Sequence, residues 1–103
     1  MASGTEQAYP IDDAMTRALD MHKAGRLGEA QALYQRVLQA RPNHPEALHF
    51  LGLLAHQRGK SDVAVSMIRQ AIAAGFGGAL AYYNLAEAYR ALGQTEEAIA
   101  SYR

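Results

Sequence analysis

Apolar side chains recur along most of this chain at intervals of three and four residues, which is the spacing of one face of an α-helix. One such stripe consists of Ala64, Met67, Ile68, Ala71 and Ile72. An earlier stripe with the same spacing consists of Ala30, Leu33, Tyr34, Val37 and Leu38. The chain shows no alternation of apolar and polar residues of any length, so the pattern predicts helices and no sheet.

The helical pattern itself returns every 34 residues. Gly25, Gly59 and Gly93 have this spacing, and three further series share it. These series are Ala30, Ala64 and Ala98; Tyr34, Ile68 and Tyr102; and Ala18, Gly52 and Ala86. Four series with one period indicate a repeated unit. We expect two helices in each unit, joined at Gly25, Gly59 or Gly93, because a sharp turn after a helix favours a residue that tolerates positive φ.

Several residues are typical of helix starts or of close helix contacts. Asn43 or His44 is expected to cap a helix that begins at Pro45, a favoured residue in a first turn. Thr95, which two glutamates follow, is expected to cap the last helix. Glycine inside a helix costs about 1 kcal/mol relative to alanine, so we expect Gly52 to let the second helix of its unit approach closely, at Ala64.

These features resemble the tetratricopeptide repeat (TPR), a unit of 34 residues that forms a helix–turn–helix. The resemblance covers residues 11–103 and is strong in the second unit, with Leu48, Leu51 and Gly52 at family positions. It predicts repeats at 11–44, 45–78 and 79–103, the last one truncated, after a flexible segment at 1–10. It implies an all-α fold of about six helices, in which antiparallel pairs stack as a right-handed superhelix.

Two places depart from the family pattern. Arg17 stands where the family has leucine, in a first helix without a preceding repeat to pack against. The link 75–78 replaces the usual proline junction, and its three glycines predict a looser connection between the second and third units. Because repeat arrays normally end in a polar capping element, we expect either a fragment of a longer protein or a partner that covers the last unit.

In TPR proteins, the first helices of successive units line a concave groove that holds a peptide or helix of a partner. The resemblance therefore implies a partner-binding groove here. Its residues are Met15, Leu19, His22, His49, Phe50, Leu53, His56, Tyr83, Asn84, Glu87 and Arg90. The apolar members suit an amphipathic or hydrophobic segment. On the alternative interpretation, Leu19, Phe50 and Leu53 pack between adjacent first helices and expose little.

The polar groove positions have alternatives of their own. His22, His56 and Arg90 share one repeat position and form either a pH-dependent ladder that attracts a carboxylate or three solvated surface residues. Some TPR proteins clamp a C-terminal carboxylate with lysine and asparagine side chains. That clamp is absent, because its positions carry Met15, Leu19, His49, Phe50 and Leu53. Asn84 matches a backbone-binding asparagine of other arrays.

Composition narrows the function further. Ten basic and ten acidic side chains give no net charge and no basic face, so neither nucleic-acid binding nor a polybasic membrane patch is expected. The chain has no cysteine. His49 and His56 lie roughly 10 Å apart along a helix, too far to share a metal ion, and no cofactor is expected. The chain start does not resemble a signal peptide, and no apolar stretch reaches the ~18 residues of a membrane span, so we expect a cytoplasmic protein.

The motifs of catalysis are also missing. The sequence has no glycine-rich phosphate loop, no recognisable nucleophile setting and no paired ligand motif. We therefore expect a protein–protein interaction scaffold rather than an enzyme. One alternative is an N-terminal module of a larger enzyme, such as a bacterial glycosyltransferase or sulfotransferase. The other is self-association, in which the open C-terminal end forms a homo-oligomer.

Overall fold

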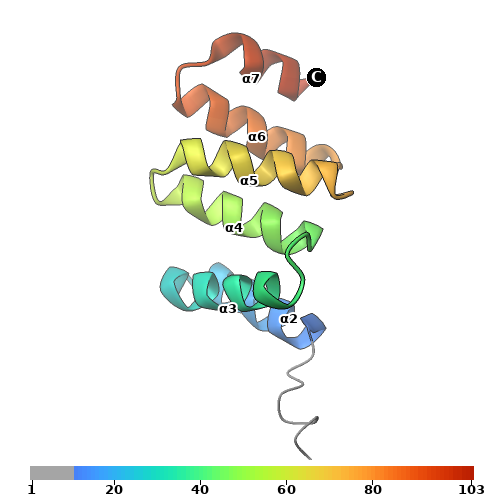
Figure 1. Ribbon diagram of the computed structural model, residues 1–103. Helices are drawn as coiled ribbons and strands as arrows, with labels where there is room; N and C mark the ends of the chain where they lie inside the picture. Colours follow the sequence, from blue (N-terminus) through green and yellow to red (C-terminus); the bar gives the residue numbers. More distant parts are fainter. Residues whose placement is uncertain (1–10) are drawn as a thin grey trace, which may run out of the picture. The chain divides into compact units, whose positions relative to one another are not determined.

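The computed structural model describes residues 11–103, which form six α-helices and no strand (Figure 1). The helices are α2 (Ile11–Lys23), α3 (Leu27–Ala40), α4 (Pro45–Gln57), α5 (Ser61–Ala73), α6 (Ala79–Ala91) and α7 (Thr95–Tyr102). The expected all-α class is confirmed, and the two helices of each pair run antiparallel. The flexible segment predicted at 1–10 lies outside the described residues.

The helices belong to two compact units. The first contains α2 and α3 and ends at Pro42, and the second begins at Asn43 and contains α4 to α7. In the first unit, Ala18, Ala30 and Tyr34 are fully buried. In the second unit, α5 packs against both α4 and α6, and α7 packs against α6. Its core cluster consists of Ala64, Ile68, Ala81, Leu85, Ala88, Tyr89 and Ala98.

The repeated glycines occupy equivalent corners, as the sequence predicted. Gly25, Gly59 and Gly93 have φ values of 80°, 83° and 77°. The residue after each glycine donates its backbone N–H to the carbonyl five residues earlier, which is the Schellman ending of a helix. These bonds are Arg26 to Met21 (2.9 Å), Lys60 to Ala55 (2.8 Å) and Gln94 to Tyr89 (2.9 Å). The same local geometry therefore ends the first helix of every pair.

Gly52 lies where α4 and α5 approach most closely, which confirms its predicted role. A Cβ atom at this position would lie 2.9 Å from Ile68 Cγ1 and 3.2 Å from Met67 Cβ. It would also lie 3.4 Å from the backbone oxygen of Ala64. Ala64, the predicted contact, is thus one of three neighbours, together with Ile68 and Met67. The close crossing of α4 and α5 depends on a residue without a side chain at position 52.

The helix caps agree with the sequence in one case and not in the other. His44 caps α4, because its Nδ1 accepts the backbone N–H of Ala47 at 3.2 Å. Thr95, the predicted cap of α7, is instead the first helical residue, and Gln94 occupies the cap position without a side-chain bond. The prediction was wrong because Gln94, the residue after Gly93, already closes the turn, so α7 begins at Thr95, one residue earlier than a Thr95 cap would place it.

The link between α5 and α6 is anchored at Phe76. Gly75 has φ of 113°, and the backbone N–H of Phe76 donates to the carbonyl of Ala71 at 2.9 Å. The half-buried Phe76 packs against the core cluster of the second unit. The link therefore begins with the same helix ending as the repeat corners, which the interpretation of three glycines as a loose junction did not anticipate.

Candidate functional site

Two predicted groove residues of the second unit bond to each other. Nδ2 of Asn84, on α6, lies 3.1 Å from Nε2 of His49, on α4. His49 is fully buried and Asn84 is 8% exposed. The buried pair therefore joins the first helices of two successive helix pairs.

Aromatic rings surround the imidazole of His49. Its centroid lies 4.7 Å from the Phe50 ring and 4.5 Å from the Phe76 ring. Burial lowers the pKa of His49 to about 4, so the imidazole is neutral at neutral pH. Nδ1 of His49 is buried and has no hydrogen-bond partner among the described residues.

The apolar strip of this face, Phe50, Leu53 and Tyr83, is accessible in part. Phe50 and Leu53 are half-buried and share one face of α4, because they lie three residues apart. Tyr83, on α6, is 54% exposed. Its ring lies 5.9 Å from that of Tyr102, on α7. The strip therefore combines one aromatic and one aliphatic side chain of α4 with an exposed tyrosine of α6.

A polar cluster lies farther along α6. Glu87 accepts hydrogen bonds from the Tyr102 hydroxyl and from Arg90 Nη2, the latter at 2.8 Å. These two bonds, with that of Tyr102 first, lower the pKa of Glu87, and the charges of Arg90 and His56 contribute to the same shift. Nδ1 of His56 lies 2.9 Å from the Ser61 hydroxyl. One carboxylate thus interacts with groups from three helices, α4, α6 and α7.

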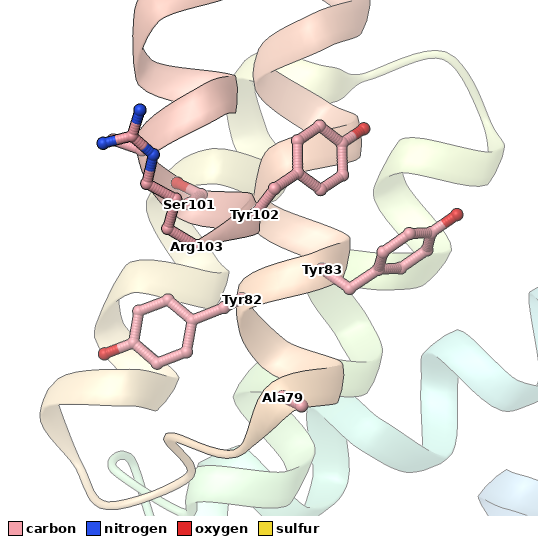
Figure 2. Close-up of a pocket in the computed structure, with 7 residues that line it drawn as sticks. Ala79, Tyr82, Tyr83, Ser101, Tyr102 and Arg103 are labelled. Atoms are coloured by element: carbon pink, nitrogen blue, oxygen red, sulfur yellow. The ribbon is translucent and has the colours of Figure 1, made fainter.

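A pocket that the sequence analysis missed opens between α6 and the end of α7. It has a volume of about 410 Å³, and its lining includes Tyr82, Tyr83, Tyr102 and Arg103. Figure 2 shows that Tyr82 and Tyr83 point away from each other on α6. The sequence analysis assigned only Tyr83 to the groove, and the closeness of Tyr102 to Tyr83 depends on how α7 packs against α6.

The groove residues of the first unit are less exposed. Met15 is buried, and Leu19 and His22 are half-buried. Nδ1 of His22 lies 2.9 Å from the hydroxyl of Tyr34, a buried residue whose pKa burial raises to about 12. The hydroxyl therefore stays protonated and can donate to the imidazole. All three members of the proposed ladder, His22, His56 and Arg90, thus contact a residue of their own helix pair.

Residues 11–103 contain neither a cluster suited to a metal ion nor a helix suited to a membrane span. No group of three or more His, Cys, Asp or Glu side chains there is arranged to hold a metal ion. In the same range, every helix is too short or too polar to cross a membrane.

The sequence matches the family model described as tetratricopeptide repeat over residues 15–75 and 57–103. These matches cover most of the chain, and the chain therefore belongs to the tetratricopeptide repeat family. A comparison with curated proteins finds no significant match.

Solved structures of TPR proteins resemble this chain closely. A mutant O-GlcNAc transferase of Thermobaculum terrenum superimposes with a TM-score of 0.85 and 35% identity, over 88% of this chain and 18% of the transferase. The first TPR of Spaghetti (RPAP3), bound to the HSP90 peptide SRMEEVD, superimposes with a TM-score of 0.83 and 25% identity. This match covers 89% of this chain and 73% of the Spaghetti chain. MamA gives 0.80 and 21%, over 89% of this chain and 54% of MamA, and shows the fold alone.

The chain is much shorter than some of these proteins. It spans about a fifth of the length of the transferase and about half of that of MamA. The fold is thus shared with proteins of very different overall size.

Proposed function

We propose that this chain is a protein-interaction scaffold and that a segment of its partner lies along the strip formed by Phe50, Leu53 and Tyr83. Family membership supports protein binding in general. The observation that carries the specific proposal is that these three side chains stay partly accessible at family binding positions. The polar residues His49 and Asn84 bond to each other and leave the apolar side chains to contact the partner.

The chemistry of the strip suggests what the segment looks like. Apolar anchors, as on an amphipathic helix or an extended peptide, suit Phe50, Leu53 and Tyr83. The cluster of Glu87, Arg90 and His56 offers both signs of charge at the polar end, so no strongly acidic or basic ligand is favoured. A tyrosine that is half exposed before binding can be covered on binding, which makes Tyr83 the expected main contact.

A displayed peptide library tests this proposal. Peptides are selected on the wild-type chain, and their affinities are then measured on Tyr83→Ala and Tyr82→Ala variants. Tyr82 is the matched control, because it is 41% exposed, adjacent in sequence and directed away from Tyr83 (Figure 2). Loss of about 2 kcal/mol, or roughly 30-fold in Kd, is expected for Tyr83→Ala alone. Selected peptides that bind both variants with wild-type affinity would remove the strip as the binding site.

A defined peptide separates this proposal from carboxylate clamping. SRMEEVD is the HSP90 peptide seen bound to Spaghetti. Here the clamp positions of α4 carry His49, which is fully buried, and the half-buried Phe50 and Leu53. We expect no measurable binding of SRMEEVD in a titration followed by fluorescence anisotropy. Micromolar binding that a C-terminal amide abolishes would show that the ligand is chosen by its carboxylate instead.

A second candidate function is that of a recognition module in a longer enzyme. It rests on the 35% identity to the O-GlcNAc transferase, of which this chain matches only a part. An antibody against this chain, used on extract of the source cells, tests it by size. A band no larger than the chain itself would contradict the module. Cytoplasmic location and self-association through α6 and α7 stay predictions.

A further inference from the structure

The pair of His49 and Asn84 is unusual because it is buried, polar and shared between two helix pairs. The two residues are 35 positions apart in sequence, and each lies on the first helix of its own pair. Direct contact between α4 and α6 is small compared with the packing of α5 on either of them. One side-chain hydrogen bond is therefore a substantial part of what joins these two helices directly.

The geometry restricts the protonation state in which this bond exists. In this orientation the amide nitrogen of Asn84 donates to the lone pair of Nε2, so the proton of the neutral ring lies on Nδ1, which has no hydrogen-bond partner among the described residues. A second proton on the ring would occupy that lone pair and set two donors against each other. It would also place a cation at a fully buried position, between Phe50 and Phe76.

Among residues 11–103, the ring contacts of His49 include no ionised group that would stabilise such a cation. The ring contacts two phenylalanines and an amide, and the link 74–78 carries no titratable residue. The titratable or charged groups of the helices packed around it are Glu46 and His56 on α4, Asp62 and Arg69 on α5, and Tyr82, Tyr83, Glu87, Tyr89 and Arg90 on α6. Burial is the cause of the lowered pKa of His49, without a contribution from any of these charges.

We propose that the bond between His49 and Asn84 is a tie between the second and third helix pairs that forms only while the imidazole is neutral, so that mild acid weakens the packing of α6 on α4. His49 acts in this as a positioning residue. The inference concerns stability and needs no partner. Its consequence, that acid also weakens binding at the strip of Phe50, Leu53 and Tyr83, rests on the proposed function.

The direction and size of the effect follow from linkage. A histidine whose pKa is lowered in the folded state adds stability above the unfolded pKa of about 6.5, and this stability is lost as the pH falls toward about 4. Between pH 8 and pH 5, the unfolding equilibrium constant should rise about 30-fold because of this one group. Above pH 7 the effect should be absent.

Urea unfolding at pH 8 and pH 5 tests the proposal. The background carries His44→Asn, because His44 also accepts a hydrogen bond on its ring and asparagine keeps the cap without titrating. In this background the protein should still lose stability between pH 8 and pH 5, and the addition of His56→Gln should not change this loss. The addition of His49→Gln should largely abolish it. An undiminished acid effect in the His49→Gln variant would overturn the proposal.

Titration of the wild-type imidazole by NMR keeps the test valid if His49→Gln does not fold. The His49 ring should titrate well below pH 6, and Asn84→Asp should move its midpoint upward by at least about one pH unit, because a carboxylate would pair with the cation. A wild-type midpoint near 6.5, or no movement with Asn84→Asp, would refute the tie. Weak partner binding at every pH, with these results unchanged, would count against the proposed function alone.

Discussion

Replacement of Gly52 by alanine measures how tightly α4 and α5 are packed. In an exposed helix, the same change would stabilise the protein by about 1 kcal/mol, because alanine has the higher helix propensity. At Gly52 the new Cβ would lie 2.9 Å from Ile68 Cγ1 and 3.2 Å from Met67 Cβ. Both distances are shorter than an ordinary carbon–carbon contact, so propensity and packing oppose each other.

The structure decides which of the two effects is larger. Ile68 is fully buried and branched at Cβ, so its side chain has little freedom to rotate away. Met67 Cβ is attached to the backbone and can move only if α5 moves. Overpacking of this kind costs typically 1–3 kcal/mol. Subtraction of the propensity gain leaves a net destabilisation of about 1 kcal/mol.

Urea unfolding followed by circular dichroism gives the net value, and a double-mutant cycle isolates its cause. Ile68→Ala removes the nearest atom, so Gly52→Ala should cost less in that background, with a coupling of about 1 kcal/mol. Gly28→Ala, at an exposed position in α3, is the control and should be neutral or stabilising. If Gly52→Ala stabilises the wild type, or costs the same in both backgrounds, the close approach is not what keeps glycine at this position.

Two further predictions concern local backbone geometry, and thermal unfolding checks both. Gly75→Ala should destabilise by about 1 kcal/mol because φ is 113° there, whereas Gly77→Ala, where φ is not positive and the nearest atoms are 3.9 Å away, should be neutral or slightly stabilising. Equal effects at both positions would contradict this account of the link. His44→Ala should cost about 1 kcal/mol, and His44→Asn should restore most of it. Loss of stability in both His44 variants would show that the imidazole contributes by packing instead.

The repeat made most of the fold predictable from sequence. A period of 34 residues and the helical spacing of apolar residues fix six helices and three glycine corners, because each depends on local geometry that recurs. The cap of α7 was predicted wrongly, at Thr95, because the prediction considered this residue without the turn before it. A preference for helix caps is a property of one residue, whereas the start of α7 is set by the turn at Gly93 that precedes it.

The candidate site was predictable only in part. Repeat position indicates which face of a helix a residue occupies, but not whether a residue of the next repeat covers it. His49 and Asn84 were both assigned to the groove, and the hydrogen bond between them was not predicted. The pocket beside Tyr82 was missed because it depends on where α7 places Tyr102 and Arg103.

The pairing of His49 with Asn84 also affects how ligand selectivity can arise. A polar residue at a groove position usually contributes by bonding to the ligand, and an unsatisfied one would penalise an apolar ligand. Here the two polar groups bond to each other, so the surface above them can accept apolar side chains without leaving the Asn84 amide unpaired. Under the proposed function, discrimination among ligands would depend on the fit around Tyr83 and on the charges of Glu87 and Arg90. For this reason, exchange of Asn84 alone should reduce stability more than it changes which peptides are selected, whereas exchange of Tyr83 should do the opposite.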